Sequence, residues 1–156
     1  MSQAGKAELY VKKIRNGTVI DHISAGYALD VLKILNITGK ESNTVGVVMN
    51  VPSKLISKKD IVKIECGELR PEDVDKIALI SPNATINIIR EYDVVDKKKV
   101  SLPKDIRGIV KCSNPSCISN KEPVGSLFHV QKVEPIRLRC HYCNRMMEKK
   151  DILSQF

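Results

Sequence analysis

Residues 112–117 read CSNPSC and residues 140–143 read CHYC, and these two segments decide how the end of the chain folds. Together they place four cysteines in the pattern Cys-x4-Cys-x22-Cys-x2-Cys. Each short turn can point two thiolates at one ion, and the chain between the turns is long enough for two or three strands. Zinc prefers four such soft ligands in a tetrahedron. The spacing therefore predicts one structural zinc ion bound by Cys112, Cys117, Cys140 and Cys143.

Other uses of these cysteines are weaker hypotheses. A pair of disulfides would leave Cys66 over and is rarely kept inside a cell. A catalytic zinc needs an open coordination position, and four thiolates leave none. An iron–sulfur cluster remains a minor rival on spacing alone. His141 lies within the second turn and His129 upstream of it, and both are expected to be ordinary polar residues.

The segments around the cysteines predict a small all-β domain over residues 105–156. RGIVKC, SLFHVQKV and PIRLRC alternate apolar with polar or basic residues, as half-buried strands do. A unit of about 50 residues is too small to bury a large core. We therefore expect the metal to stabilise it, and the domain to unfold when zinc is removed.

Residues 1–104 have a different pattern of short β-branched segments and two amphipathic stretches. ELYVKKI and GTVIDHI read as extended segments that meet at Asn16-Gly17, a strong turn signal. TVGVVMNVP and KKDIVKIEC, separated by PSKLIS, predict two neighbouring strands. In AGYALDVLKILN, apolar residues recur at spacings of three and four, which predicts a helix. Its expected buried face consists of Ala25, Ala28, Leu29, Leu32 and Leu35.

A second helix is predicted to begin at Pro71, whose fixed φ suits a first helical position, with Glu72 and Asp73 opposing the positive end of the helix dipole. ATINIIREY and DVVDKKKV then add two strands. Strand, helix, strand, strand, helix, strand is the order of a ferredoxin-like antiparallel sheet covered by two helices. The predicted class is therefore α+β, with this domain followed by the zinc ribbon. The expected buried face of the second helix is Val74, Ile77, Ala78 and Ile80.

The composition limits the class of protein and indicates the charge that its partners carry. The chain has 156 residues, of which 42% are hydrophobic and 28% charged, a globular balance that excludes disorder and collagen. It has no apolar run of about 20 residues and no secretory signal, so we expect a soluble cytoplasmic protein without a membrane partner. The formal charge of +8 favours acidic partners. Only 4% of residues are aromatic, which argues against stacking on many nucleic-acid bases.

No catalytic motif is convincing. The chain lacks a phosphate-cradling glycine-rich loop and a nucleophile elbow. Asp21 and His22 are the nearest approach to an acid–base pair, but adjacent strand residues face opposite ways, so we do not expect them to share one centre. Cys66 lies in a strand-like run and is expected to be buried and inert.

Several of these segments carry a resemblance when they are taken together. GTVIDHI, NVPS followed by KKDIVKIE, SPNATINIIREYDVVDK, SLP, CSNPSCISNKEPV and CHYC occur in the order found in aspartate carbamoyltransferase regulatory chains. The resemblance covers the chain from about residue 8 to residue 143. GTVIDHI combined with the Ile-Ser-Asn-x-Glu-Pro-Val run is close to a signature. The chain is identified as a member of this family.

The resemblance implies a regulatory role in pyrimidine biosynthesis without catalysis. In this family the N-terminal domain dimerises and binds an allosteric nucleotide, and the zinc domain docks on a separate catalytic chain. The usual assembly joins two catalytic trimers through three regulatory dimers. CTP is the inhibitor and ATP the activator in many members, and UTP assists inhibition in some. Nucleic acid is not an implied partner.

Carried over residue by residue, the resemblance implies a nucleotide pocket. His22 and Lys97 would approach the triphosphate, which needs cations. Asp21 and Lys63 would hold the ribose and the base edges. The base would be held largely by backbone groups of Val11, Lys12, Lys13 and Ile14. The remaining wall would be Asn87, Ile89, Tyr92 and Val94.

Lys12 departs from the family pattern, in which an acidic residue stands at this position. The added positive charge lies near the expected base, so the resemblance does not decide which base is preferred or whether CTP inhibits or activates. The main alternative from another class is a nucleic-acid-binding zinc ribbon attached to a ferredoxin-like domain. Charge and ribbon favour it, whereas the few aromatic residues and the lack of a basic stripe do not.

Overall fold

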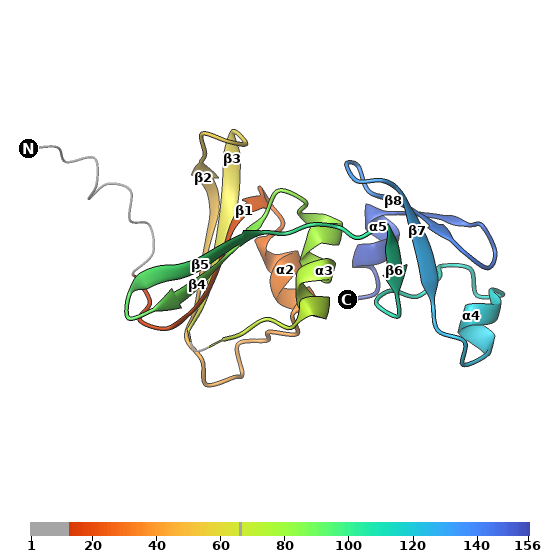
Figure 1. The fold of residues 1–156 in the computed structure, drawn as a ribbon, viewed down its shortest axis with the longest axis horizontal. Helices are drawn as coiled ribbons and strands as arrows, with labels where there is room; N and C mark the ends of the chain where they lie inside the picture. The colour runs from red at the N-terminus through yellow and green to blue at the C-terminus, as the bar shows by residue number, and fades with distance from the viewer. Residues whose placement is uncertain (1–12, 66) are drawn as a thin grey trace, which may run out of the picture.

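The structure is a computed structural model that describes residues 13–65 and 67–156, and it contains two antiparallel sheets (Figure 1). The first sheet has five strands in the order β2-β3-β1-β4-β5, and the second has four in the order β6-β7-β8-β9. The predicted α+β class is confirmed. The strands of the first sheet are β1 Gly17–Ser24, β2 Val45–Pro52, β3 Lys58–Glu65, β4 Thr85–Arg90 and β5 Asp93–Lys99. Those of the second are β6 Asp105–Arg107, β7 Leu127–Lys132, β8 Arg137–Cys140 and β9 Met146–Glu148.

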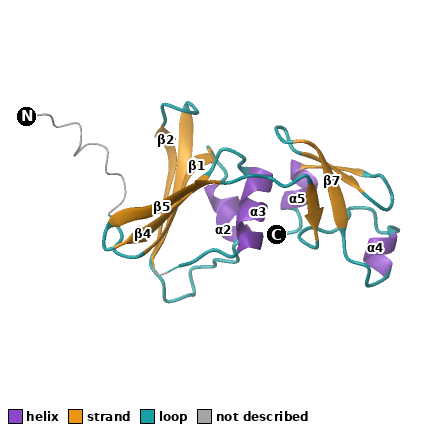
Figure 2. Ribbon diagram, in the orientation of Figure 1, coloured by secondary structure: helices purple, strands orange, loops and turns teal. Residues whose placement is uncertain are grey.

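Two helices, α2 Ala28–Ile34 and α3 Pro71–Ile80, lie against one face of the five-stranded sheet (Figure 2). Alternate strand residues point toward them and form the core, including Ile20, Val62 and Ile86. The order β1-α2-β2-β3-α3-β4 is the predicted ferredoxin-like order, and β5 adds an edge strand paired with β4. Among the residues that the structure describes, no helix lies against the opposite face of this sheet.

Helix α3 agrees with its prediction, whereas α2 differs from its prediction in two residues. α3 begins at Pro71 as predicted, and its Ile77, Ala78 and Ile80 are buried. In α2 the prediction for Leu29 was wrong, because this side chain is 61% exposed. The helix begins at Ala28, so Ala25 lies outside it, and the fully buried stripe is Ala28, Val31 and Ile34. Across residues 13–65 and 67–156, no helix combines the length and the apolar character that crossing a membrane requires.

The four-stranded sheet has its own core around Phe128, Leu138 and Met147, which are all fully buried. SLFHVQKV and PIRLRC were predicted correctly and form β7 and β8. The strand predicted for RGIVKC was wrong. The short strand β6 ends at Arg107, because Gly108 turns the chain with a φ of 66°. Helices α4 Ile118–Lys121 and α5 Lys149–Leu153 and strand β9 were not predicted.

Helix α5 and the C-terminus join the two sheets. Leu153 and Phe156 pack against the core beneath the first sheet, whereas Leu79 of α3 belongs to the core of the second. The Lys149 Nζ atom lies 4.3 Å from the centroid of the Tyr27 ring, at the start of α2. Figure 1 shows the C-terminus beside α3.

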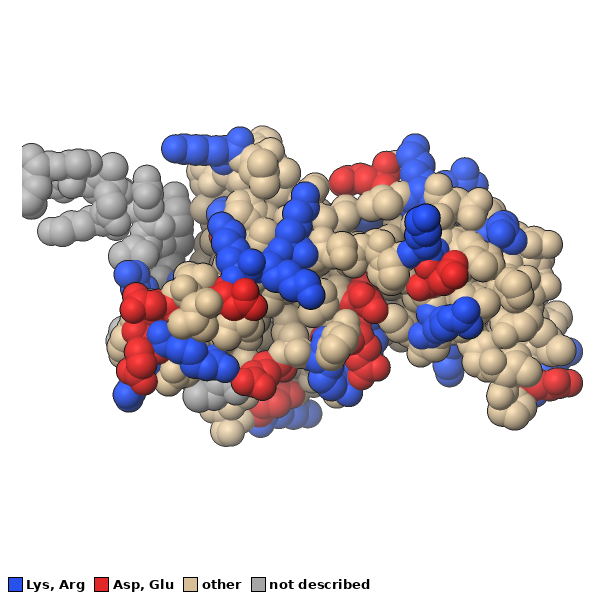
Figure 3. Space-filling view, viewed as in Figure 1, with Lys and Arg blue, Asp and Glu red and all other residues tan. Residues whose placement is uncertain are grey.

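Charged side chains of both signs are scattered among uncharged residues on the surface drawn in Figure 3. On the side drawn in Figure 3, acidic and basic side chains are interspersed over both sheets. The excess of 26 Lys and Arg over 18 Asp and Glu is therefore not gathered into one continuous stripe on that side.

Candidate functional site

The four predicted metal ligands meet at one end of the second sheet. Cys112 follows β6, Cys117 directly precedes α4, Cys140 ends β8 and Cys143 lies in the turn before β9. Their four Sγ atoms all lie within 4.8 Å of one another, with 3.5 Å between Cys112 and Cys143 and 3.6 Å between Cys117 and Cys140. Sulfurs bonded at about 2.3 Å to a tetrahedral ion are about 3.8 Å apart, so the quartet fits one metal ion.

This geometry bears on the alternatives for the cysteines. All four are free, and a sulfur separation of 3.5 Å is far longer than a disulfide of about 2.05 Å. The two histidines lie outside the quartet, as expected. His129 contacts Asp105 Oδ1 through Nδ1 at 2.7 Å, and its Nε2 lies 2.9 Å from His141 Nδ1. They form a polar chain beside the metal centre.

An asparagine that sequence reasoning did not select holds the first cysteine turn. Asn120 Nδ2 donates to the carbonyl oxygens of Cys112 and Asn114, each at 2.8 Å. The backbone N–H of Asn114 donates in turn to Cys112 Sγ at 3.5 Å. Asn120 lies in the Ile-Ser-Asn run noted above, and asparagine commonly bonds nearby backbone groups, which is the signal that would have found it.

In the absence of a metal ion, the pKa values of Cys112, Cys140 and Cys143 are shifted in different directions. Burial raises the pKa of Cys112 to about 12, and burial also raises the pKa of Cys140. Burial opposes ionisation of Cys143 as well, but hydrogen bonds from the backbone of Arg145 and from Asn114 lower its pKa to about 7. Thiolates are the ligands, so metal binding must displace protons at neutral pH.

The helix-free face of the five-stranded sheet gathers most of the predicted pocket residues that the structure describes. Residues paired across neighbouring strands share a face. Lys63 pairs with Val19, Val19 with Asn87, and Asn87 with Lys97, so these four form one row across β3, β1, β4 and β5. The predicted wall residues Ile89 and Val94 pair with each other two positions along β4 from Asn87, on the same face.

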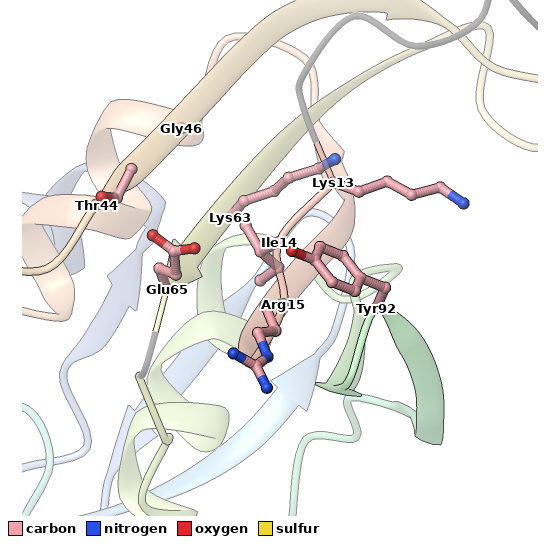
Figure 4. Close-up of a pocket in the computed structure, with 8 residues that line it drawn as sticks. All are labelled: Lys13, Ile14, Arg15, Thr44, Gly46, Lys63, Glu65 and Tyr92. Atoms are coloured by element: carbon pink, nitrogen blue, oxygen red, sulfur yellow. The ribbon is translucent and has the colours of Figure 1, made fainter.

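Two adjoining cavities lie at one end of this face. Their volumes are about 320 Å³ and 380 Å³, and both are lined by Lys13, Ile14, Lys63 and Tyr92. Figure 4 shows Tyr92 next to Ile14, with the side chain of Lys63 running past them toward Lys13. The remaining predicted base residues, Val11 and Lys12, lie outside the described residues, as does Cys66.

A larger hollow of about 670 Å³ lies at the other end, where His22 and Lys59 line it. The expectation that Asp21 and His22 face opposite ways was wrong. Ile20 pairs with Val62 and Ile23 with Asp60, so Asp21 and His22 together oppose the single residue between those partners. This β-bulge, in which His22 has a φ of 56°, redirects the side chains. His22 Nδ1 consequently lies 3.9 Å from Asp21 Oδ1.

The electrostatics of this end favour an anion. Burial lowers the pKa of His22 below 6.5, the charges of Lys59 and Lys97 lower it further, and Asp21 opposes the shift. Burial also lowers the pKa of Lys63, against the influence of Asp21 and with that of Lys13. Several basic groups therefore surround one carboxylate, and His22 is predominantly neutral at pH 7.

Lys59 is a basic residue of this hollow that sequence reasoning did not select. Its Nζ atom lies 2.9 Å from Asp21 Oδ1. The signal was the alternation along β3: Lys59, Ile61 and Lys63 share one face, and Lys63 had already been selected. Val19 lines a cavity and was missed for a similar reason, since it alternates with Asp21.

Comparison with known proteins agrees with both parts of this geometry. Residues 9–101 match the family described as aspartate carbamoyltransferase regulatory chain, allosteric domain, and residues 104–153 match the metal binding domain of the same chain. The chain belongs to the family of aspartate carbamoyltransferase regulatory chains. The resemblance inferred from the sequence is confirmed, and the chain is a non-catalytic regulatory one.

Similar proteins extend over nearly the whole length. The chain is 52% identical over 152 residues to the aspartate carbamoyltransferase regulatory chain of Korarchaeum cryptofilum, covering 96% of this chain and 97% of the relative. It is 54% identical over 150 residues to that of Pyrococcus abyssi, covering 95% and 98%. It is 56% identical over 144 residues to that of Methanothrix thermoacetophila, covering 92% and 94%.

Proposed function

We propose that this chain binds a nucleoside triphosphate on the helix-free face of the five-stranded sheet and thereby controls an aspartate carbamoyltransferase catalytic chain. The observation that carries the proposal is the arrangement of one face: Ile14 and Tyr92 line cavities at one end together with lysines, and His22 and Lys59 line a larger hollow at the other. A base with its ribose fits the first end, and phosphates fit the second.

The proposed role of each residue follows from its position along this face, between the base end and the phosphate end. Lys13 and Ile14 hold the base together with Val11 and Lys12. Asp21 and Lys63 contact the ribose and base edges, and the wall is formed by Asn87, Ile89, Tyr92 and Val94. His22 and Lys97 bind the triphosphate, joined by Lys59. CTP, ATP and UTP are the proposed effectors. Because Lys12 replaces the acidic residue of the family pattern, the proposal does not assign which nucleotide activates and which inhibits.

The proposed metal is zinc, one structural ion per chain. Four thiolates and a tetrahedral quartet suit zinc, which needs no open position for a structural role. A cluster of several iron and sulfide ions needs more room than sulfurs within 4.8 Å leave. The ion would hold the first cysteine turn and the β8–β9 turn together.

Residues 105–156 are proposed to dock on the catalytic chain, and residues 1–104 to form the nucleotide-binding domain and the dimer contact. The second sheet and its loops expose large apolar side chains, which is what a docking surface requires. These are Ile118, Val124, Val133 and Tyr142. The proposed assembly, two catalytic trimers with three regulatory dimers, would be cytoplasmic.

Sedimentation of the zinc-loaded chain with the catalytic trimer from the same source tests this function. A complex much larger than either component is expected. Failure to associate, with one zinc per chain verified, would contradict the proposed partner. Binding of the free chain to RNA or DNA with a steep salt dependence would instead support the nucleic-acid alternative, which family membership does not favour.

A further inference from the structure

A fully buried carboxylate lies directly behind the proposed phosphate end. Asp60 in β3 is 0% exposed and accepts three hydrogen bonds, all from backbone N–H groups. Its Oδ1 atom accepts from Asn50 at 2.8 Å. Its Oδ2 atom accepts from Gly26 at 2.9 Å and from Ala28 at 3.0 Å. One side chain thus joins β3 to a second strand and to the start of α2.

The three amides belong to irregular backbone that the sheet ladder does not fix. Val48 pairs with Ile61 and Val51 with Lys59, so a second bulge, in β2, lies opposite Asp60. Asn50 in this bulge has a φ of 61°. The bulge of β1 ends at Ile23, which pairs with Asp60 itself. Asp60 is therefore the point at which both bulges meet β3.

The residue beside this carboxylate faces the proposed nucleotide. Consecutive strand residues point to opposite faces, so Lys59 extends toward the hollow whereas Asp60 extends toward α2. Lys59 contacts Asp21, and Asp21 precedes His22 in the bulge of β1. A shift of Lys59 toward a phosphate would act on the backbone that carries the Asp60 carboxylate.

The hydrogen bonds that Asp60 accepts from the start of α2 connect it toward the metal domain. Gly26 and Ala28 flank Tyr27, the residue at the start of α2. The Tyr27 ring contacts Lys149 of α5 at 4.3 Å, and α5 directly follows β9 of the second sheet. A short series of contacts therefore links the phosphate end to the second sheet. It runs from Lys59 to its neighbour Asp60, through the hydrogen bonds of Asp60 to the residues on either side of Tyr27, and from the Tyr27 ring to Lys149.

We propose that Asp60 is a positioning residue that couples the phosphate end of the nucleotide site to the contact between α2 and α5. The inference rests on the proposed function and adds the route by which that site acts on the metal domain. Asp60 itself touches no nucleotide. It holds the bulge of β2 and the start of α2 against the strand position next to Lys59, and it transmits the position of Lys59 to Tyr27.

The test compares variants in the full complex with the catalytic chain. The probe is whichever of CTP, ATP and UTP changes the velocity of the wild-type complex most. In Asp60→Asn an amide NH₂ replaces one acceptor oxygen, so at least one of the three amides loses its bond. We expect nucleotide affinity to fall about tenfold and the velocity change at saturating nucleotide to shrink by at least about half.

Thr18→Val is the control for a purely structural loss. Thr18 is also fully buried in β1, and its Oγ1 donates to the Gly67 carbonyl oxygen at 2.6 Å, away from both bulges. This variant should lose stability but keep the full velocity change once nucleotide is saturating. If Asp60→Asn also keeps the full change at saturation, Asp60 has only a structural role and the proposal is overturned.

A second pair keeps the proposal testable if Asp60→Asn does not fold. Lys149→Met removes the cation over the Tyr27 ring and retains the apolar stem, whereas Lys150→Met changes the exposed neighbour. Lys149→Met should bind nucleotide normally and respond less, and Lys150→Met should respond fully. A full response from Lys149→Met would overturn the proposed route. No nucleotide binding by the wild-type chain would overturn the proposed function together with it.

Discussion

Lys59 Nζ lies 2.9 Å from Asp21 Oδ1, so a lysine of β3 is held by an aspartate in the bulge of β1. Both side chains are largely buried, with exposed fractions of 17% and 22%. The ammonium group is thereby fixed at the edge of the hollow that His22 also lines. In the proposed function, Lys59 and His22 form the phosphate end of the site.

Lys59→Gln is predicted to weaken nucleoside triphosphate binding about tenfold, because a charge-assisted contact to phosphate is lost. The affinity for a nucleoside without phosphates should fall much less in this variant. Lys58→Gln makes the same charge change at the exposed neighbouring position on the other face. Calorimetry that finds equal losses for the two variants would mean that only overall charge matters.

Lys97→Ala should weaken the binding of CTP, ATP and UTP by similar factors, because in the proposed site this lysine contacts the phosphates that they share. The matched control is Lys98→Ala. Lys97 pairs with Asn87 on the open face, whereas Lys98 pairs with Ile86 on the face covered by the helices. Unchanged CTP binding in Lys97→Ala would show that the pocket is assigned to the wrong residues.

The lowered pKa of His22 predicts that both the stability of the chain and its affinity for nucleotide depend on pH. Burial lowers its pKa below 6.5 in the folded chain, so between the two pKa values the unfolded chain binds more protons. Stability should therefore fall as the pH is lowered through about 6.5. A bound triphosphate favours the imidazolium ion, so nucleotide should offset this loss and bind more tightly at lower pH.

Thermal denaturation and calorimetry between about pH 5.5 and pH 7.5 test these effects. His22→Gln is the comparison, because the nucleotide phosphates titrate in both proteins and only the difference reports His22. A wild-type chain and a His22→Gln chain with the same pH dependence would contradict the role given to this histidine.

Removal of the metal should unfold the second sheet and leave the first largely folded. Phe128 and Leu138 form a core too small to persist without the crosslink between the two cysteine turns. Acidification should also release the metal, because the buried Cys112 thiol has a pKa of about 12 without it. Chelation followed by circular dichroism checks the first expectation.

Cys140→Ser is predicted to bind no zinc and to lose its association with the catalytic chain. Asn120→Ala should keep the four ligands and weaken metal affinity moderately, since it removes the two hydrogen bonds that hold the first turn. Full association of a zinc-free Cys140→Ser chain would separate metal binding from docking and contradict the account.

Features with a local cause were predictable from the sequence. The cysteine quartet follows from spacing, and α3 begins at Pro71 because the ring restricts φ. Strands β7 and β8 follow from alternation of apolar and polar residues. In these cases the deciding pattern is contained in short segments of the chain, so the sequence alone shows it.

Features decided by distant contacts were not predictable. The bulge that brings Asp21 beside His22 exists because β1 pairs with β3 on both sides of it, and no local pattern marks it. Leu29 fits a helical apolar stripe, yet the orientation of α2 is set by packing on the sheet and by the bonds to Asp60. Helix α5 has five residues and depends on tertiary contacts.

The most direct test of the central claim is the velocity of the complex of this chain with its catalytic chain, measured against CTP, ATP and UTP concentration. The account predicts that at least one nucleotide changes the velocity. It also predicts that Lys97→Ala requires about tenfold more of that nucleotide for half of the effect. A complex of verified composition and zinc content whose velocity is the same with and without all three nucleotides would contradict it.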